Sequence, residues 1–196
     1  NADEKVPLAP DSPYPYCATK AQAEQLVRSA NRDGFTTIVL RPRFIWGPGD
    51  TTLLPMIEAM AKAGKWMWID HGRAMTSTTH IANLVHAIEL SLTEGTGGEA
   101  YFILDDGTIR MKDMIGAMAK ARNLTLPEAS IPAWLADRLG RAMEAIWRTV
   151  RLPGDPPLTA HAAMVMSRDC TLNGSKAAAE LHYQPVISRA EGLAGL

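Results

Sequence analysis

The sequence predicts an α/β protein built on a parallel sheet, followed by a mostly helical lobe. Helical periodicity begins at Tyr16 and leads directly into the β-branched run Thr36–Arg41, and helix and strand patterns keep alternating as far as Arg122. The β-branched run shows little polar alternation, which is typical of a strand covered on both faces. After residue 126 the composition changes and a long amphipathic helix follows. We therefore expect an α/β part over 1–126, with interleaved segments of the second lobe, and a helical lobe over 127–196.

The first helix and the first strand frame a loop that is a candidate site. Pro15 suits a first helical turn, and Asn31–Gly34 supply a stop. Pro42 cannot continue the strand, so the chain enters the loop Arg43–Asp50 at the strand's carboxyl end. Ligands of open parallel sheets bind beyond the carboxyl ends of strands, and this loop is where we expect one.

The glycines of this loop do not predict a phosphate-binding turn. In Gly47-Pro48-Gly49 the third glycine of a dinucleotide fingerprint would fall on Thr52, and Pro48 has no N–H to donate. A tight turn before a helix is the better interpretation.

The elements that follow continue the alternation. Thr78 or Thr79 is expected to cap a helix with an apolar stripe of Ile81, Leu84, Val85, Ile88 and Leu92, on which His80 and His86 are surface or cap residues. The other expected elements are a helix over 52–63, a strand-like run over 66–69 with a turn over 70–73, a strand over 99–104 and a helix over 111–122.

The helical lobe centres on residues 132–150, a long helix with a broad apolar face. Core packing is favoured for this face, with the wall of an apolar pocket as the alternative, since it is rich in tryptophan and methionine. Shorter helices are expected over 158–167 and 175–181. The residues of the apolar face are Trp134, Leu135, Leu139, Met143, Ile146, Trp147 and Val150.

Bulk composition excludes several classes of protein. The 196 residues are 46% hydrophobic and 21% charged with a net charge of −1, which gives no basic surface for nucleic acid or anionic membranes. Cys17 and Cys170 lie far apart without metal-binding spacing, so neither a metal site nor a disulfide framework is expected, and a reducing cytoplasm fits. The polar, proline-punctuated start has no signal or membrane-spanning run and is typical of a loop cut from a longer chain.

Tyr16 and Lys20 are the candidate catalytic pair. Four residues apart at the start of a helix, they lie on one face, where the ammonium stabilises the phenolate and makes acid–base chemistry accessible to the phenol. The other three tyrosines have no lysine at this spacing. The alternative for the pair is an ordinary helix start with a half-buried aromatic ring and a solvated lysine.

With these residues in view, the sequence resembles the extended short-chain dehydrogenase/reductase family, the superfamily of NAD-dependent epimerases and dehydratases, and in particular its branch of hydroxysteroid and sterol dehydrogenases. The resemblance runs in family order from residue 13 to nearly the end of the chain. It rests on Tyr16-x-x-x-Lys20 with Ala23-Glu24, Leu40-Arg41-Pro42 leading into Ile45-Trp46-Gly47-Pro48-Gly49, Thr79-His80-Ile81-x-Asn83-Leu84, and the segment from Asn173 through Glu180 and Tyr183-x-Pro185 to Glu191-Gly192-Leu193.

The resemblance implies a fold and a set of residue roles. The fold would be the C-terminal part of a Rossmann-type doubly wound parallel sheet plus a small helical substrate-binding lobe, with the first βαβ units absent. Tyr16 would exchange a proton with the substrate, and Lys20 would support it and bind the nicotinamide ribose. The loop residues Pro42, Arg43, Phe44 and Ile45 would border the nicotinamide, and Trp46, Arg73 and Trp134 would contact substrate.

Two family features are missing from this sequence. The glycine-rich turn and the residue that selects NAD or NADP belong to an N-terminal half that the sequence does not contain, so the choice of cofactor stays open. The family's catalytic serine or threonine would precede residue 1, and Ser12 in the proline-rich entry is a poor substitute. Without the strands of that N-terminal half, the strand at Ile38–Leu40 loses its neighbours and exposes an apolar edge, so we expect a homodimer or an association with the missing half.

The resemblance implies an NAD(P)-dependent oxidoreductase for a secondary alcohol or ketone of an apolar substrate such as a sterol, with this chain inactive alone. A nucleotide-sugar epimerase or dehydratase uses the same pair and is the first alternative. The second is a non-enzymatic binding module without a cofactor half.

Overall fold

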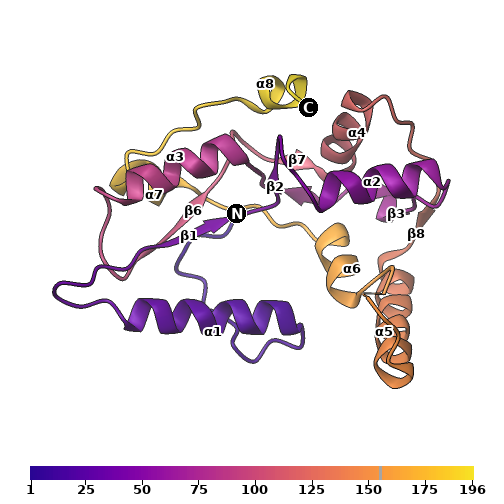
Figure 1. The fold of residues 1–196 in the computed structure, drawn as a ribbon, viewed down its shortest axis with the longest axis horizontal. Coiled ribbons are helices and arrows are strands. Elements are labelled where there is room, and N and C mark those ends of the chain that lie inside the picture. The colour runs from indigo at the N-terminus through magenta and orange to yellow at the C-terminus, as the bar shows by residue number, and fades with distance from the viewer. Residues whose placement is uncertain (155) are drawn as a thin grey trace. The chain divides into compact units, whose positions relative to one another are not determined.

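A computed structural model describes residues 1–154 and 156–196 of the chain (Figure 1). The helices are α1 (Pro15–Ser29), α2 (Leu53–Lys62), α3 (Ile81–Ser91), α4 (Met111–Ala121), α5 (Ala133–Val150), α6 (Ala160–Ser167), α7 (Ser175–Glu180) and α8 (Arg189–Ala194), with a 3-10 turn η1 at Asp70–Gly72. The strands are β1 (Val39–Pro42), β2 (Ile45–Trp46), β3 (Trp68–Ile69), β4 (Met75–Thr76), β5 (Thr79–His80), β6 (Ala100–Ile103), β7 (Ile109–Arg110) and β8 (Ser130–Ile131).

The chain folds into two units that are interleaved in sequence. The first contains residues 1–50, 76–108 and 171–196, and the second contains residues 51–75 and 109–170. The expected boundary between residues 126 and 127 falls inside the second unit.

The first unit is built on parallel strand pairs, as predicted. Strand β1 pairs with β6, with Val39 opposite Ala100, and β2 pairs with β5, with Ile45 opposite Thr79. Helix α7 packs on β6, α3 packs on both β1 and β6, and α1 lies along β1. The core of this unit contains Ala87, Tyr101, Ile103, Ala177, Leu181 and Tyr183. This arrangement confirms the expected α/β class.

Two predictions in the first unit need correction. Strand β1 includes Pro42 as its last residue, and its four residues are half-buried, not covered on both faces. Among the described residues it pairs with β6 only. Helix α3 buries Asn83 and Ala87, while Val85 and Ile88 of the expected apolar stripe are each 46% exposed and Leu92 is also exposed. The small and amide side chains face the sheet because the helix lies close to it.

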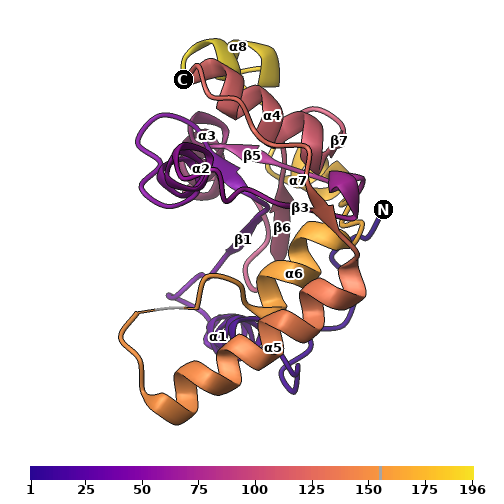
Figure 2. The same ribbon diagram turned by 90° about the vertical axis from the view of Figure 1, so that its right-hand side faces the viewer.

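The second unit packs helices α5 and α6 side by side (Figure 2). The expected core role of the long helix is wrong for four of its seven large apolar residues, since Trp134, Leu139, Ile146 and Val150 are 40–62% exposed. Helix α5 buries Ala136 and Gly140 instead. A Cβ on Gly140 would lie 2.6 Å from backbone atoms at the start of α6, so the close approach of the two helices selects the small-residue face.

Candidate active site

Helix α1 presents the Tyr16/Lys20 pair as the sequence predicts. Pro15 occupies the first turn, and the ammonium nitrogen of Lys20 lies 5.9 Å from the centroid of the Tyr16 ring. Tyr16 is 61% exposed and Lys20 is exposed, so the phenol hydroxyl and the ammonium group are accessible to a bound molecule. The phenol and the ammonium can therefore act together on one molecule.

A buried ion pair joins α1 to β1. The Arg41 guanidinium donates to both carboxylate oxygens of Glu24, over 2.8 Å from Nε and 2.5 Å from the second nitrogen. Glu24 lies one turn beyond Lys20, and its side chain is only 9% exposed. A bidentate pair has a defined geometry, so it sets the position of α1 on the strand. The sequence motif contained Glu24, but no local pattern indicated this partner.

The loop after β1 has a strained and tightly held backbone. Phe44 adopts a φ of 48°, in the left-handed region, where a non-glycine residue costs about 1–3 kcal/mol unless its surroundings enforce it. The amide of Arg43 donates to Thr79 Oγ1 over 2.9 Å, and the amide of Thr79 donates to the Phe44 carbonyl over 3.4 Å. The expected cofactor loop Pro42–Ile45 is thus anchored to β5.

A buried carboxylate at the end of β6 organises the rest of this region. Asp105 accepts four hydrogen bonds of 2.7 Å, from Trp46 Nε1, Thr78 Oγ1, the His80 amide and Asn83 Nδ2. Asp105 is 5% exposed. The sequence motifs did not indicate this aspartate; its place just after the strand predicted over 99–104, the buried β6, was the signal that could have marked it.

Asn83 connects the Asp105 network to the C-terminal segment. Its Oδ1 accepts from the amides of Val186 and Ile187 over 2.8 and 3.0 Å, and its Nδ2 also donates to the Ile187 carbonyl. Asn83 is fully buried, and both its donor and its acceptor are used on the dipeptide Val186–Ile187. These bonds fix where the C-terminal segment crosses α3.

Trp46 lies inside this network. We expected it to contact substrate, but its side chain is 1% exposed and its indole N–H donates to Asp105. The ring packs edge-on against His80, with the centroids 4.7 Å apart. Gly47 and Gly192 leave room for the two rings, because an added Cβ would lie 2.8 Å from His80 Nε2 at Gly47 and 2.7 Å from the Trp46 ring at Gly192. The structure gives Trp46 a packing role.

Arg73 and Trp134 lie in the second unit. Arg73 is exposed and donates from Nε to the Asp70 carbonyl over 3.1 Å. Trp134 is 60% exposed, with the Arg138 guanidinium 5.4 Å from its ring centroid. Their expected contact with substrate stays a prediction.

His80, one of the two histidines predicted to be surface or cap residues, is buried and caps helix α3, whereas Thr78 and Thr79 do not. Its Nδ1 accepts from the Ala82 amide over 3.2 Å, so the neutral ring carries its proton on Nε2, which is buried and has no hydrogen-bond partner among the described residues. The two threonine hydroxyls are committed to Asp105 and to the Ile103 carbonyl, which removes them as caps. An imidazole with one accepting nitrogen replaces the hydroxyl that we expected.

We predict that His80 makes folding stability sensitive to mild acid. Burial lowers the pKa of His80 below its ordinary 6.5, while the nearby Asp105 acts in the opposite direction. The unfolded chain therefore takes up this proton at a higher pH than the folded chain does, so stability is complete above about pH 6.5 and falls as the pH drops from there towards the lowered pKa. Urea unfolding at several pH values should show this slope in the wild type and lose it in His80→Gln. Parallel profiles for the two proteins would contradict the prediction.

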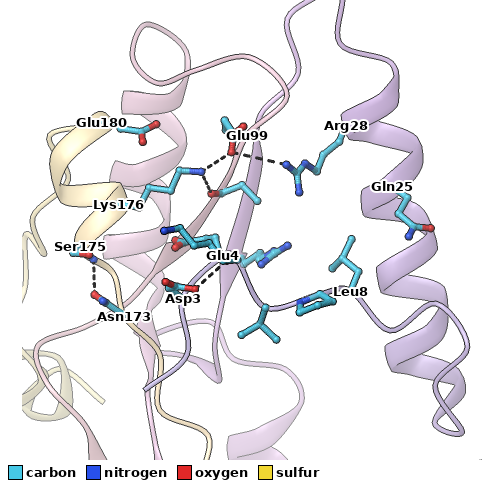
Figure 3. Close-up of a pocket in the computed structure, with 15 residues that line it drawn as sticks. Asp3, Glu4, Leu8, Gln25, Arg28, Glu99, Asn173, Ser175, Lys176 and Glu180 are labelled. Carbon is cyan, nitrogen blue, oxygen red and sulfur yellow. Dashed lines mark hydrogen bonds and ion pairs between the residues drawn. The ribbon is translucent and has the colours of Figure 1, made fainter.

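A pocket of about 970 Å³ in the first unit does not contain the candidate pair Tyr16 and Lys20 (Figure 3). Glu99 lies between Lys176 of α7 and Arg28 of α1: Lys176 donates to its carboxylate over 2.6 Å, and an Arg28 nitrogen lies 3.8 Å from it. The hydrogen bond from Lys176 lowers the pKa of Glu99. Neither Tyr16 nor Lys20 lines this pocket. Lys176 and Glu99 thus neutralise each other within the pocket, and we do not assign it a ligand.

Within residues 1–154 and 156–196, no group of three or more His, Cys, Asp or Glu side chains is arranged to hold a metal ion. None of the helices described here combines the length and the apolar character needed to cross a bilayer.

Comparison with solved structures identifies the fold class. The chain superposes on a dTDP-glucose 4,6-dehydratase, DesIV of Streptomyces venezuelae solved with NAD and TYD bound, with a TM-score of 0.68 at 19% identity, covering 99% of this chain and 52% of that one. At this identity the likeness shows the fold alone. The fold is a partial Rossmann-type α/β fold of the kind found in short-chain dehydrogenases and epimerases.

Sequence comparison then identifies the family. The model of the 3-beta hydroxysteroid dehydrogenase/isomerase family matches residues 1–133, and the chain belongs to this family. It is 37% identical over 195 residues to the 4-hydroxy-2-methyl-3-oxo-4-farnesyl-3,4-dihydroquinoline-1-oxide ketoreductase of Stigmatella aurantiaca, which covers 99% of this chain and 58% of that protein. It is 36% identical over 197 residues to the 2-alkyl-3-oxoalkanoate reductase of Stenotrophomonas maltophilia, covering 98% and 59%. The chain thus spans somewhat more than half the length of these relatives.

Proposed function

We propose that the full-length protein is an NAD(P)-dependent oxidoreductase that interconverts a ketone and a secondary alcohol on an apolar substrate. The observation that carries this proposal is the pairing of Tyr16 and Lys20 on one accessible face of α1, with the ammonium 5.9 Å from the phenol ring. Family membership supports it, as do the names of two relatives, a ketoreductase for a farnesylated quinoline and a reductase for alkyl oxoalkanoates.

The pair fits a nicotinamide riboside and a carbonyl group by its donor chemistry. Lys20 offers three ammonium donors for ribose hydroxyls, and Tyr16 offers a phenolic O–H on the same face. A reduced nicotinamide, when bound, supplies the hydride that adds to the carbonyl carbon. Tyr16 donates its proton to the carbonyl oxygen, which becomes the alcohol, and Lys20 stabilises the phenolate until a proton returns from solvent. Arg43 and Phe44 would border the carboxamide through their backbone.

A nucleotide-sugar epimerase or dehydratase is the second candidate, because the superposed dehydratase shares the fold. The apolar compounds in the relatives' names favour the ketoreductase. A homodimer and a cytoplasmic location remain predictions. Neither NAD nor NADP is favoured.

A substrate panel tests the proposal directly. The full-length protein should oxidise NADH or NADPH in the presence of a 2-alkyl-3-oxoalkanoate or a 3-oxosteroid, and leave dTDP-glucose and UDP-glucose unchanged. Both cofactors are assayed by absorbance, and the products by mass spectrometry. Turnover of the sugar nucleotides would favour the epimerase or dehydratase. Cofactor-independent binding of the ketone without turnover would favour the binding module.

A further inference from the structure

A single buried hydroxyl bridges the end of β6 and the loop after β1. Thr79 is fully buried in β5. Its Oγ1 donates to the Ile103 carbonyl over 2.6 Å and accepts from the Arg43 amide over 2.9 Å. A hydroxyl has one proton to donate, so the proton is committed to β6 and the oxygen lone pair to the loop.

The bridge lies where the chain changes strand partners. Strand β1 ends at Pro42 beside β6, and β2 begins at Ile45 beside β5, so Arg43 and Phe44 alone make the transition. Thr79 holds both of them, Arg43 through its hydroxyl and Phe44 through its own amide, which donates to the Phe44 carbonyl. The left-handed backbone at Phe44, φ 48°, persists only where its surroundings enforce it. Thr79 supplies two of the contacts that do so.

We propose that Thr79 is a positioning residue for the cofactor loop, acting through the Arg43 amide and the Phe44 carbonyl. This inference rests on the proposed function, in which the backbone of Arg43 and Phe44 borders the nicotinamide. The Thr79 hydroxyl is hydrogen-bonded to the Ile103 carbonyl and the Arg43 amide. Thr79 therefore fixes the position of the loop without contacting cofactor or substrate. Misplacement of a binding group by about 1 Å can lower catalysis by about 10²-fold, which makes such a hydroxyl consequential.

Two substitutions in the full-length protein separate the hydroxyl from the shape of the side chain. Thr79→Val keeps the branched shape and removes both hydrogen bonds, whereas Thr79→Ser keeps the hydroxyl. We expect Thr79→Val to weaken NAD(P)H binding, measured by fluorescence titration, by about 10-fold or more, and to accelerate hydrogen exchange of the Arg43 amide. Thr79→Ser should restore both towards wild type.

Thr76→Val is the matched control for a general loss of stability. Thr76 is also buried, but its hydroxyl donates to the Ser77 carbonyl and not to a loop group. It should leave cofactor affinity and Arg43 exchange unchanged. Equal weakening by Thr79→Ser and Thr79→Val would assign the effect to packing and overturn the proposal, as would wild-type affinity in Thr79→Val.

The exchange readout keeps this proposal distinct from the proposed function. If the wild-type protein binds neither NADH nor NADPH, the proposed function fails and the cofactor role of Thr79 fails with it. Arg43 exchange in the two Thr79 variants still decides whether the hydroxyl fixes the loop. Unchanged Arg43 exchange in Thr79→Val would overturn the positioning role even if cofactor binding were observed.

Discussion

Tyr16→Phe in the full-length protein should lower kcat for ketone reduction by about 10²- to 10⁴-fold and leave the Kd for NAD(P)H within about twofold of wild type. The substitution removes the O–H that delivers a proton to the carbonyl oxygen and keeps the ring beside Lys20. Hydride transfer would then leave an alkoxide without its proton donor. Steady-state kinetics and cofactor fluorescence titration measure the two effects separately.

Tyr14→Phe is the matched control for this experiment. Tyr14 precedes helix α1 and carries the same hydroxyl, but it has Ala18 and not a lysine four residues on. Its kcat should stay near that of the wild type. Full activity of Tyr16→Phe would show that the pair is an ordinary helix start, and equal losses in both variants would point to a folding defect.

Asp105→Ala should produce the largest loss of stability, with a fall of at least about 3 kcal/mol in the free energy of unfolding. The substitution leaves four buried donors without their acceptor, and a buried donor without a partner costs about 1–3 kcal/mol. Two of these donors, the indole of Trp46 and the amide of Asn83, also connect the loop after β1 and the C-terminal segment to the same point. Urea unfolding followed by tryptophan fluorescence measures the loss.

Asp106→Ala controls for the removal of a carboxylate from this turn. Asp106 is the next residue, and its side chain is exposed, so its replacement should change stability by less than about 0.5 kcal/mol. Asp105→Asn should fall between the two, because it keeps one acceptor oxygen but turns an NH₂ group towards donors. Equal stability of Asp105→Ala and Asp106→Ala would refute the organising role of Asp105.

Features that depend on neighbours in the chain could be predicted from the sequence. Helices α1, α4 and α5 begin and end within two residues of the expected positions, because the 3.6-residue period of apolar side chains and the turn residues that bound it are local signals. The shared face of Tyr16 and Lys20 follows from the same period. The alternation of helices with short apolar runs predicted parallel strands, which the β1–β6 and β2–β5 pairs show.

Burial was predicted less well, because periodicity locates an apolar face but not what covers it. Three of the five stripe residues of α3 and four of the seven apolar residues of α5 are exposed, although Leu84 of the stripe does pack against the core. The fully buried positions are Asn83 and Ala87 in α3 and Ala136 and Gly140 in α5. At Gly140 the close approach of two backbones determines which face of α5 is buried, because a Cβ there would clash with the start of α6. Such proximity depends on chain segments 20 residues apart and has no signature in the helix itself.

The sequence by itself determined the family, the alternation of elements and the candidate catalytic pair, since these depend on short motifs and on the residues next to them. Only the tertiary structure decided that Asp105 gathers Trp46 and the His80 amide, that the His80 ring is buried, and that Thr79 holds the loop at Phe44. Those contacts join residues distant in sequence, such as Trp46 and Asp105, which are 59 residues apart. A buried carboxylate or hydroxyl takes whichever donors the fold brings to it, so its partners are known only once the strands and helices are packed.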